Sequence, residues 1–367
     1  MPETRTVITV DGSPLRGPDL DLVRSVSVEE ALGSQAKVSL TVTMLTGARS
    51  AWTSPLDALV SAAKPFTVAI SRGDETCSVD ARSVGASWSF VPGGASTLTV
   101  EGLDRSVELD RRDVQRLWQD ATDADIAQRI FAEHGLNADV DSTPSGTDSD
   151  TYSPQQNATD WAFLKSLAAR NGFDVYVESD AGVATGRFRR INVTASPQTR
   201  LALGYGALGG QAAASVQLLA GQEVHVTRSV PGTADVDVAS DEGTGHAMGS
   251  RSLGGASLVR TNATAGVTVV DAQTTATAMA ERSAFGATLN VSLSSPEAPL
   301  VRARRTVTIA GLGEALDGLW LVRSVRHTVT PGGHVQVVGL IRNALGDPAA
   351  GGLGALAGLA TAVGVSL

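Results

Sequence analysis

A short segment with the pattern of a β-hairpin occurs twice in this chain, and the duplication limits the folds that the chain can adopt. The stretch RSVGASWSFVPGGASTLTVEGLDR covers residues 82–105, and RSVRHTVTPGGHVQVVGLIR covers residues 323–342. Both contain Arg-Ser-Val, a strand-like run, Pro-Gly-Gly, alternating apolar residues and Gly-Leu-x-Arg. The turns at Pro92 and Pro331 are 239 residues apart (331 − 92), and the similar runs FTVAI and RTVTI upstream keep that spacing. Two copies are too few for a repeat array, so the pattern indicates a duplicated domain.

Length and composition predict a folded protein of several domains. The chain has 367 residues, of which 42% are hydrophobic and 18% charged, as in ordinary globular proteins. The net charge is −9, so no overall positive field is present that would attract nucleic acid or an anionic membrane. Nucleic-acid binding is therefore not expected. Stable membrane insertion is not expected either, because the apolar segment from Ala349 to Leu367 is dominated by Gly and Ala and has no basic flank or aromatic belt.

The cysteine content and the N-terminal segment bear on the cellular compartment. Cys77 is the only cysteine, which excludes an intrachain disulfide and a cysteine-based zinc site. It lies in the alternating run DETCSVD, so we expect it to pack as a small apolar residue. The opening MPETRTVITVDG lacks the apolar core of a signal peptide, and assembly in the cytoplasm is expected.

The first part of the chain has the period of β-strands. Between Thr4 and Arg105, apolar residues alternate with Ser and Thr, and Gly-containing turns separate the runs. Several short antiparallel strands at regular spacing predict a small barrel, which we assign to residues 1–105.

The period then changes to that of helices. Trp118 to Gly135 predicts a helix that begins at Thr122, with Asp125 completing a capping box. A second helix begins after Asn157 or Thr159 and ends at Asn171-Gly172. Its apolar face is expected to consist of Trp161, Leu164, Leu167 and Ala168, and a strand over residues 173–178 follows. These elements predict an α/β insertion domain over residues 106–188.

The rest of the chain predicts a second barrel that is interrupted. We assign residues 189–231 and 301–345 to this barrel and residues 232–300 to a second insertion domain, which contains a helix from Asp271 to Ala284. Residues 346–367 form a tail rich in Gly and Ala and uncharged from Ala349 to Leu367, which we expect to be flexible or to dock on a partner. The fold class is therefore mainly β with α/β insertions and two similar tube-like barrels.

Few residues suggest chemistry. Gly352 to Gly358 superficially matches a dinucleotide fingerprint, but the required βα unit does not follow. His327 and His334 are expected to face each other across the second hairpin, without a third metal ligand. Four tryptophans lie in apolar patterns that predict core positions, namely Trp88, Trp118, Trp161 and Trp320.

Two groups of charged residues have structural explanations. Asp120, Asp123 and Asp125 could suggest general acid–base catalysis, but capping and the helix dipole account for all three. The pairs Arg111-Arg112 and Arg304-Arg305 lie near predicted domain edges and are expected at interfaces between domains. We therefore predict no catalytic, cofactor-binding or metal-binding residue and no cofactor.

Two long runs resemble the baseplate hub proteins of contractile tails and injection systems. They are EGLDRSVELDRRDVQRLWQDATDADIAQRIFAEHGL and YSPQQNATDWAFLKSLAARNGFDVYVE. The family includes the phage late control gene D proteins and the N-terminal hub region of VgrG-type spike proteins. The features that match are Gly102-Leu-Asp104, Trp118, the helix from Thr122 to Gly135, Gln156-Asn157, Asp160-Trp161-x-Phe163-Leu164 and Gly172-Phe173. The closing DGLWLVRSVRHTVTPGG, with Gly318, Val322 and His327, is also similar to the last hairpin of that family.

The resemblance implies a structural protein rather than an enzyme. A homotrimer with two similar barrels per subunit would form a ring with pseudo-sixfold symmetry. Such a hub would join the hexameric inner tube to the trimeric central spike and contact other baseplate components. The chain lacks the oligonucleotide/oligosaccharide-binding barrel and β-helix of VgrG proteins, so the spike is expected to be a separate polypeptide.

Two other function classes remain open on the residues alone. A cell-wall polysaccharide hydrolase would need two of Asp120, Asp123 and Asp125 to face each other across a cleft. A carbohydrate-binding β module would bind glycans as a monomer. The sequence does not distinguish a phage from a domesticated injection system.

Overall fold

The computed structural model describes most of the chain. The described residues are 4–46, 52–61, 63–144, 154–180, 182–203, 211–218, 220–229, 236–243, 245–253, 259–264 and 269–346. The Gly/Ala-rich tail, apart from Gly346, lies outside these residues, and so does the glycine run from Gly352 to Gly358.

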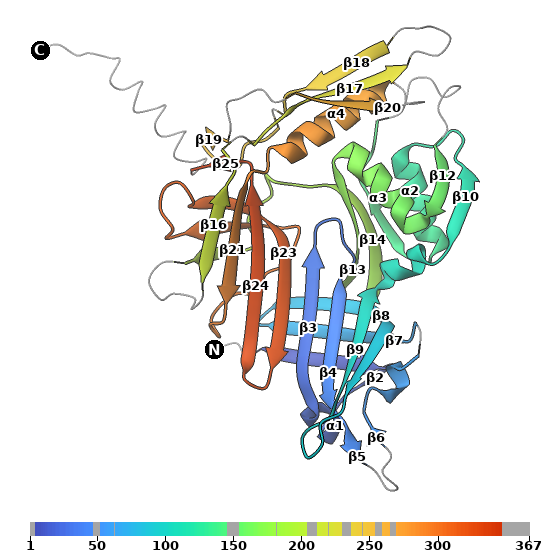
Figure 1. The fold of residues 1–367 in the computed structure, drawn as a ribbon, viewed down its shortest axis with the longest axis vertical. Coiled ribbons are helices and arrows are strands. Elements are labelled where there is room, and N and C mark those ends of the chain that lie inside the picture. The colour runs from blue at the N-terminus through green and yellow to red at the C-terminus, as the bar shows by residue number, and fades with distance from the viewer. Residues whose placement is uncertain are drawn as a thin grey trace, which may run out of the picture.

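One sheet of 13 strands includes both ends of the described chain (Figure 1). Its order is β16-β21-β24-β23-β3-β4-β9-β8-β7-β1-β2, while β22 pairs β23 and β15 pairs β22. In the first half the strands are β1 (Arg5–Val10), β2 (Ser13–Pro14), β3 (Val23–Ala31), β4 (Lys37–Thr43), β7 (Pro65–Arg72), β8 (Glu75–Ser89) and β9 (Thr97–Asp104). In the second half they are β15 (Arg200–Ala202), β16 (Ala212–Val216), β21 (Ala287–Leu293), β22 (Thr306–Ala310), β23 (Gly318–Thr330) and β24 (Gly333–Arg342).

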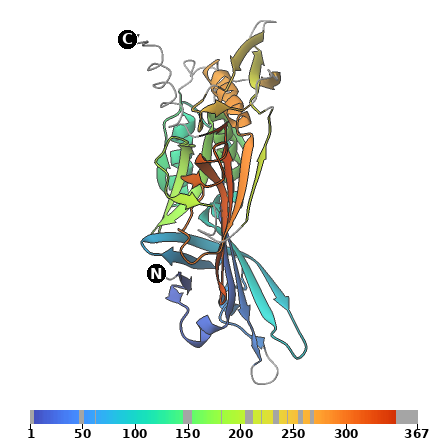
Figure 2. The same ribbon diagram turned by 90° about the vertical axis from the view of Figure 1, so that its left-hand side faces the viewer.

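Each half of this sheet bends around a hydrophobic core of its own. In Figure 1, β7 and β8 cross behind β3 and β4, and the space between them is filled by residues such as Val28, Leu40 and Val68. The core of the second half contains Leu289 and Trp320 among others. Seen from the edge in Figure 2, the long strands form a narrow, elongated layer. The mainly β fold with α/β insertions is therefore confirmed, and the two β halves are parts of one sheet.

The duplicated hairpin forms in both halves with the same irregularity. The β8–β9 ladder shifts register between Ser83 and Gly85, and the β23–β24 ladder shifts between Val322 and Ser324. These bulges are 239 positions apart (322 − 83 and 324 − 85), as are the two Pro-Gly-Gly turns. A bulge sharpens the bend of a strand, which lets β8 pair β7 with its first part and leave it after the bulge.

Two of the repeated sequence motifs are not equivalent in space. Gly102 faces the core, where an added Cβ would overlap the ring of Phe66, whereas Gly339 lies on the outer face of β24. The two Arg-Ser-Val triplets are 241 positions apart (323 − 82), whereas the two bulges are 239 apart. The triplets therefore do not occupy equivalent positions relative to the bulges. An alignment that is shifted by one residue assigns every side chain of a strand to the opposite face of the sheet. Aligning the two hairpins by their sequence motifs alone therefore pairs residues that are not equivalent.

The two halves are joined edge to edge. Strand β3 pairs antiparallel with the second part of β23, from Ala31 opposite Ser324 to Val26 opposite Val329. Arg326 and Glu29 form an ion pair of 2.6 Å across this joint on its outer side. Strand β23 bonds β22 before its bulge and β3 after it, so one strand belongs to both halves.

The first α/β unit follows β9 through a 3₁₀ turn, Arg105–Asp110. Its elements are β10 (Asp113–Leu117), α2 (Asp123–Glu133), β11 (Asn137–Val140), β12 (Gln155–Thr159), α3 (Asp160–Asn171), β13 (Phe173–Asp180) and β14 (Val183–Arg190). The capping box of Thr122 and Asp125 is confirmed, and Thr159, not Asn157, caps α3. Gly172 ends α3 at φ 68°, in the left-handed region that glycine adopts without strain.

The second α/β unit consists of a small sheet covered by one helix. The sheet contains β17 (Glu223–Ser229), β18 (Val236–Asp241) and β20 (Val259–Thr264), and α4 (Val269–Ser283) packs on it. This differs from the expected boundaries in two places. Strand β17 belongs to this small sheet and not to the second barrel, whereas β21 belongs to the large sheet because it pairs with β24 and β16. The division into separately folding domains stays a prediction.

Short elements complete the described chain. They are α1 (Pro18–Asp21), β5 (Leu45–Thr46), β6 (Trp52–Thr53), a 3₁₀ turn (Asp57–Leu59), β19 (Arg251–Ser252) and β25 (Ala344–Leu345). No helix among the described residues combines the length and apolar character that a bilayer crossing requires.

The core predictions hold with one exception. Cys77, Trp118, Trp161 and Trp320 are all buried. Trp88 is wrong as a core residue, because 48% of it is exposed. It points to the same side of the sheet as the core residues, but it lies on the free-standing end of β8, past the last strand that could cover it.

Substituting Gly102 tests the close packing of the first hairpin. We expect Gly102→Ala to lower the free energy of unfolding by about 1–3 kcal/mol, because the new methyl group must displace the ring of Phe66. Gly85→Ala is the matched control, since its Cβ would meet only the Glu101 Cβ at 3.9 Å. Urea unfolding of both variants measures the difference, and equal stabilities would contradict this packing.

Candidate functional site

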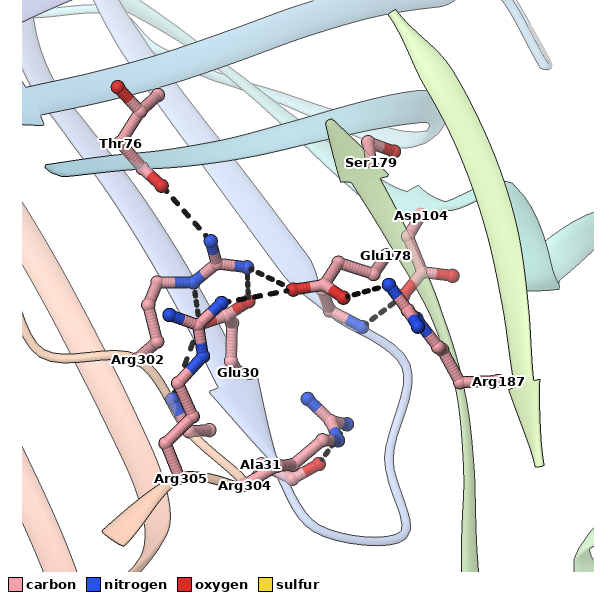
Figure 3. A network of polar contacts seen from close by, with 12 residues as sticks. Glu30, Ala31, Thr76, Asp104, Glu178, Ser179, Arg187, Arg302, Arg304 and Arg305 are labelled. Carbon is pink, nitrogen blue, oxygen red and sulfur yellow. Dashed lines mark hydrogen bonds and ion pairs between the residues drawn. The ribbon is translucent and has the colours of Figure 1, made fainter. Parts of the chain in front are cut away.

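A cluster of charged side chains joins the two halves of the large sheet to the first α/β unit (Figure 3). We call it the ionic junction and define it as Glu30, Asp174, Glu178, Arg187, Arg302, Arg304 and Arg305. The cluster combines the end of β3, strands β13 and β14, and the segment between β21 and β22. Residues from three parts of the chain thus meet in one place.

The centre of the junction is a buried pair with two hydrogen bonds. The Arg302 Nη2 donates to Glu30 Oε1 at 2.7 Å, and its Nε donates to Oε2 at 2.8 Å. Both side chains are only 8% exposed. Burial alone raises the pKa of Glu30, but the charge and hydrogen bonds of Arg302 outweigh it and lower that pKa from 4.5 to about 2. Arg302 also donates to the Thr76 carbonyl at 3.0 Å, which ties the pair to β8.

Glu178 extends the junction into the first α/β unit. Its carboxylate lies 3.5 Å from Arg302 Nη2, 3.6 Å from Arg305 Nη2 and 3.1 Å from Arg187 Nη2. Glu178 is on β13 and Arg187 on the neighbouring β14. One carboxylate therefore forms ion pairs both with the α/β unit and with the second half of the sheet.

Arg304 makes the second connection between the parts. Its Nε donates to Asp174 Oδ2 at 2.7 Å, its Nη2 donates to the Ala31 carbonyl at 2.6 Å, and its guanidinium lies 4.2 Å from the centre of the Tyr176 ring. Asp174 also accepts from the backbone N–H of Gly33 at 2.8 Å. Burial is the main cause that raises the pKa of Tyr176 to about 12. The β3–β4 turn is thus held against β13.

A chain of polar groups lies on the core side of the second hairpin. His327 Nδ1 and His334 Nε2 are 3.2 Å apart, and His334 Nδ1 is 3.0 Å from Arg72 Nη2. Arg72 also donates to the Thr4 hydroxyl and to the Ala298 carbonyl. Burial lowers the pKa of His327 to about 4, and burial together with the nearby positive charges lowers that of His334 to about 3. Both imidazoles are therefore neutral at neutral pH, and the predicted contact between them is confirmed.

The junction is arranged to hold parts together and not to react. Each of its carboxylates is engaged by an arginine, and the central pKa is moved away from neutral pH, which does not suit a general acid or base. Of the aspartates considered from the sequence, Asp123 is paired with Arg170 and Asn171, and Asp125 caps α2. Asp120 lies before the helix at φ 49°. The geometry thus does not bring these three into a facing pair.

The described residues contain no group of three or more His, Cys, Asp or Glu that could hold a metal ion. Of the arginine pairs, Arg304-Arg305 is at an interface between parts of the chain, as expected, whereas Arg111-Arg112 is exposed. Sequence reasoning missed Glu30, Asp174 and Glu178. Glu30 had a signal, since it occupies an inward position in the alternation Val26, Val28, Glu30.

Two of the unpaired strand edges in the described chain belong to the large sheet, one on β16 and one on the end of β8. Strand β16 pairs only β21, and all but its last residue are exposed. The end of β8 after its bulge, residues 84–89, pairs only β9. Large apolar side chains gather near that end of β8, among them Trp88, Phe90 and Trp52, and the Trp52 and Phe90 rings are 5.6 Å apart. Unpaired edges beside exposed aromatic residues are typical of surfaces that contact another chain.

Comparison with known families decides the assignment. The family model of the phage tail baseplate hub (GPD) matches residues 29–333, which is most of the chain. The chain belongs to this family of phage tail baseplate hub proteins. The matched region contains the ionic junction, both α/β units and all of β23, together with the Glu29–Ala31 part of β3. A search of curated protein sequences gave no match.

Solved structures share the fold at low sequence identity. A tail protein from Neisseria meningitidis MC58 has a TM-score of 0.66 and 12% identity, over 93% of this chain and 97% of that one. The 43 kDa tail protein of prophage MuSo2 from Shewanella oneidensis has a TM-score of 0.64 and 15% identity, over 94% and 97%. An E. coli protein described as a component of the type VI secretion system has a TM-score of 0.57 and 12% identity, over 91% and 76%. This hub is thus similar in fold to tail proteins along nearly its whole length.

Breaking the central pair of the junction tests its contribution to stability. We expect Glu30→Gln to lower the free energy of unfolding at pH 7 by about 3–5 kcal/mol, because Arg302 stays buried without its main counter-ion. The double variant Glu30→Leu/Arg302→Met is the control and should recover much of this loss, since it buries no charge. Chemical denaturation of the three proteins makes the comparison, and an unchanged single variant would contradict the role given to this pair.

The pH dependence of stability tests the buried histidines. In the unfolded chain, His327 takes up a proton below its ordinary pKa of 6.5, whereas in the fold it does so only near 4. The unfolded state therefore binds more protons between these values, and stability falls as the pH drops from 6.5 to 4. We expect His327→Gln to reduce this slope by up to about 1.4 kcal/mol per pH unit. Unfolding measured at several pH values checks it; His334 shifts in the same direction and leaves a smaller slope in the variant.

Proposed function

We propose that this hub protein is a structural adaptor that joins the hexameric inner tube to the trimeric central spike of a contractile tail or injection system. Three copies would form a ring in which six similar β units surround the axis. One side of such a ring fits a sixfold partner and the other a threefold partner. The inner tube, the spike and neighbouring baseplate proteins are the proposed partners, with assembly in the cytoplasm before incorporation into the particle.

The observation that carries this proposal is the equal share of the two halves in one sheet. The first half contributes β3, β4, β9 and β8, and the second contributes β16, β21, β24 and β23, joined by β3 and β23. Each group has four antiparallel strands, with the bulged strand at its end. A chain that already places two equal units side by side supplies the repeat that a ring of six needs.

The low identity of the solved neighbours limits them to support for the fold, and their descriptions give context. The E. coli neighbour is described as similar to T4 bacteriophage tail proteins. A Francisella structure of a PdpA–VgrG complex also matches, with a TM-score of 0.53 over 95% of this chain and 54% of that one. The proposed role for this chain is non-catalytic, and the Gly/Ala-rich tail is proposed to dock on the spike or line the hub.

Mass and symmetry in solution test the adaptor role. We expect the purified full chain to give the mass of a trimer by size exclusion with light scattering, and end views with six similar lobes by electron microscopy. Co-purification with the inner tube protein and the spike protein of the same particle tests the two partners. A chain that stays monomeric at high concentration and with both partners would overturn the proposal, and hydrolysis of peptidoglycan by the pure protein would favour the enzyme class.

A further inference from the structure

The β3–β23 joint within the chain provides a template for contact between copies. It connects the last strand of the second group of four to the first strand of the other group. At the two far ends, the corresponding strands are β8 and β16. Within the described chain, β16 and the part of β8 after its bulge, residues 84–89, lack a partner on their outer edge. If the two groups are equivalent, β8 of one copy pairs with β16 of the next copy in the same way that β23 pairs with β3.

The strand registers identify equivalent residues in the two groups. In the second half, Val322 before the bulge pairs Leu340, Leu340 pairs Leu289, and Leu289 pairs Ala214. In the first half, the corresponding cross-strand pairs lead from Ser83 to Gly102, then to Val38, and finally to Val28. Ala214 on β16 is therefore the equivalent of Val28 on β3.

The positions of the two bulges also identify the residue of β8 that lies opposite Ala214. Val28 pairs His327 across the joint, and His327 lies 239 positions after Trp88 (327 − 88), the spacing of the two bulges. The template thus puts Trp88 of one copy opposite Ala214 of the next. The neighbouring pairs become Ala86 with Val216, Ser87 with Ser215 and Phe90 with Ala212.

Backbone hydrogen bonding independently supports this register. Ser292 donates to the Gln211 carbonyl, and Gln217 donates to the Gly286 carbonyl, so odd-numbered residues of β16 bond β21 and Ala214 directs its backbone groups to the free edge. Asp104 donates to the Ala36 carbonyl, so even-numbered residues of β9 bond β4. Odd-numbered residues of β9 and of β8 then bond each other, and Trp88 also directs its backbone groups to the free edge.

Side-chain size supports the same pairing. Trp88 is 48% exposed and Phe90 58% exposed, and their proposed partners are the small residues Ala214 and Ala212. A large side chain opposite an alanine fills the space between strands without a clash. In the template, His327 and Val28 at the matching positions are fully buried.

We infer that residues 84–89 of β8 pair antiparallel with β16 of a second copy of this chain, with Trp88 opposite Ala214. This deepens the proposed function, on which it rests, by naming the surfaces that close the ring. All eight strands of a copy alternate in direction, so β8 and the next β16 meet antiparallel, and each joint repeats the β3–β23 joint. The occupant of both free edges is thus the neighbouring subunit.

A disulfide between Ser87 and Ser215 tests the register. Their template counterparts, Arg326 and Glu29, form an ion pair of 2.6 Å across the joint, so side chains at these positions reach each other. The pair is also of the non-hydrogen-bonded kind, in which Cα atoms lie about 4.5 Å apart, within the range of a disulfide. We expect the double variant Ser87→Cys/Ser215→Cys, under mild oxidation, to give covalent dimers and trimers but no larger species on a non-reducing gel. The native Cys77 is fully buried and should not interfere.

Two controls separate this inference from the proposed function. Ser89→Cys/Ser215→Cys is out of register by two residues and should crosslink at least tenfold less. Ala214→Pro removes an edge donor without breaking a bond to β21, and it should shift the trimer to monomer, whereas Ala214→Ser keeps the N–H and the trimer. Trimers by light scattering with no crosslink in the first pair would overturn the register and leave the ring intact. Monomers of the wild-type chain would overturn the ring itself.

Discussion

The pairing of β3 with β23 is the constraint on which the rest of the structure depends. It brings the beginning of the chain beside its end and makes one sheet from two bent halves. Strand β23 can serve both halves because its bulge frees it from β22 before it reaches β3. Without that joint, each half would present a further unpaired edge, and the ionic junction would lose the strand end that carries Glu30.

The ionic junction adds specificity to this joint. A buried ion pair contributes little net stability compared with apolar residues of similar size, since desolvation of both charges offsets their attraction. The ion pair instead raises the free energy of alternative arrangements in which its charges lose their partners. If the second half were placed differently relative to the first, Arg302 would lose Glu30, and if the first α/β unit were displaced, Arg304 would lose Asp174. The charges thereby favour one placement of the three parts over the alternatives.

Local sequence signals predicted local structure well. The capping box at Thr122 and the glycine at 172 bounded the first two long helices, because caps act within one turn of backbone. Long-range features were not accessible in the same way. The alternation that marks β17 and β21 as strands does not record which sheet each joins, and the two were assigned to the wrong units. The partners of Glu30 are more than 270 positions away, so its inward place in the alternation was the only local sign of the junction.

The difference between the equivalent residues Trp88 and His327 has a physical reason in the proposed ring. The β3–β23 joint lies within one chain, so its strands are already held close by the backbone and by the ionic junction, and a neutral histidine pair can occupy its core side. A joint between separate copies must in addition overcome the lost freedom of whole subunits. That free energy has to come from burial of apolar surface, and an indole supplies far more of it than an imidazole. Divergence at this one position therefore matches the different tasks of the two joints.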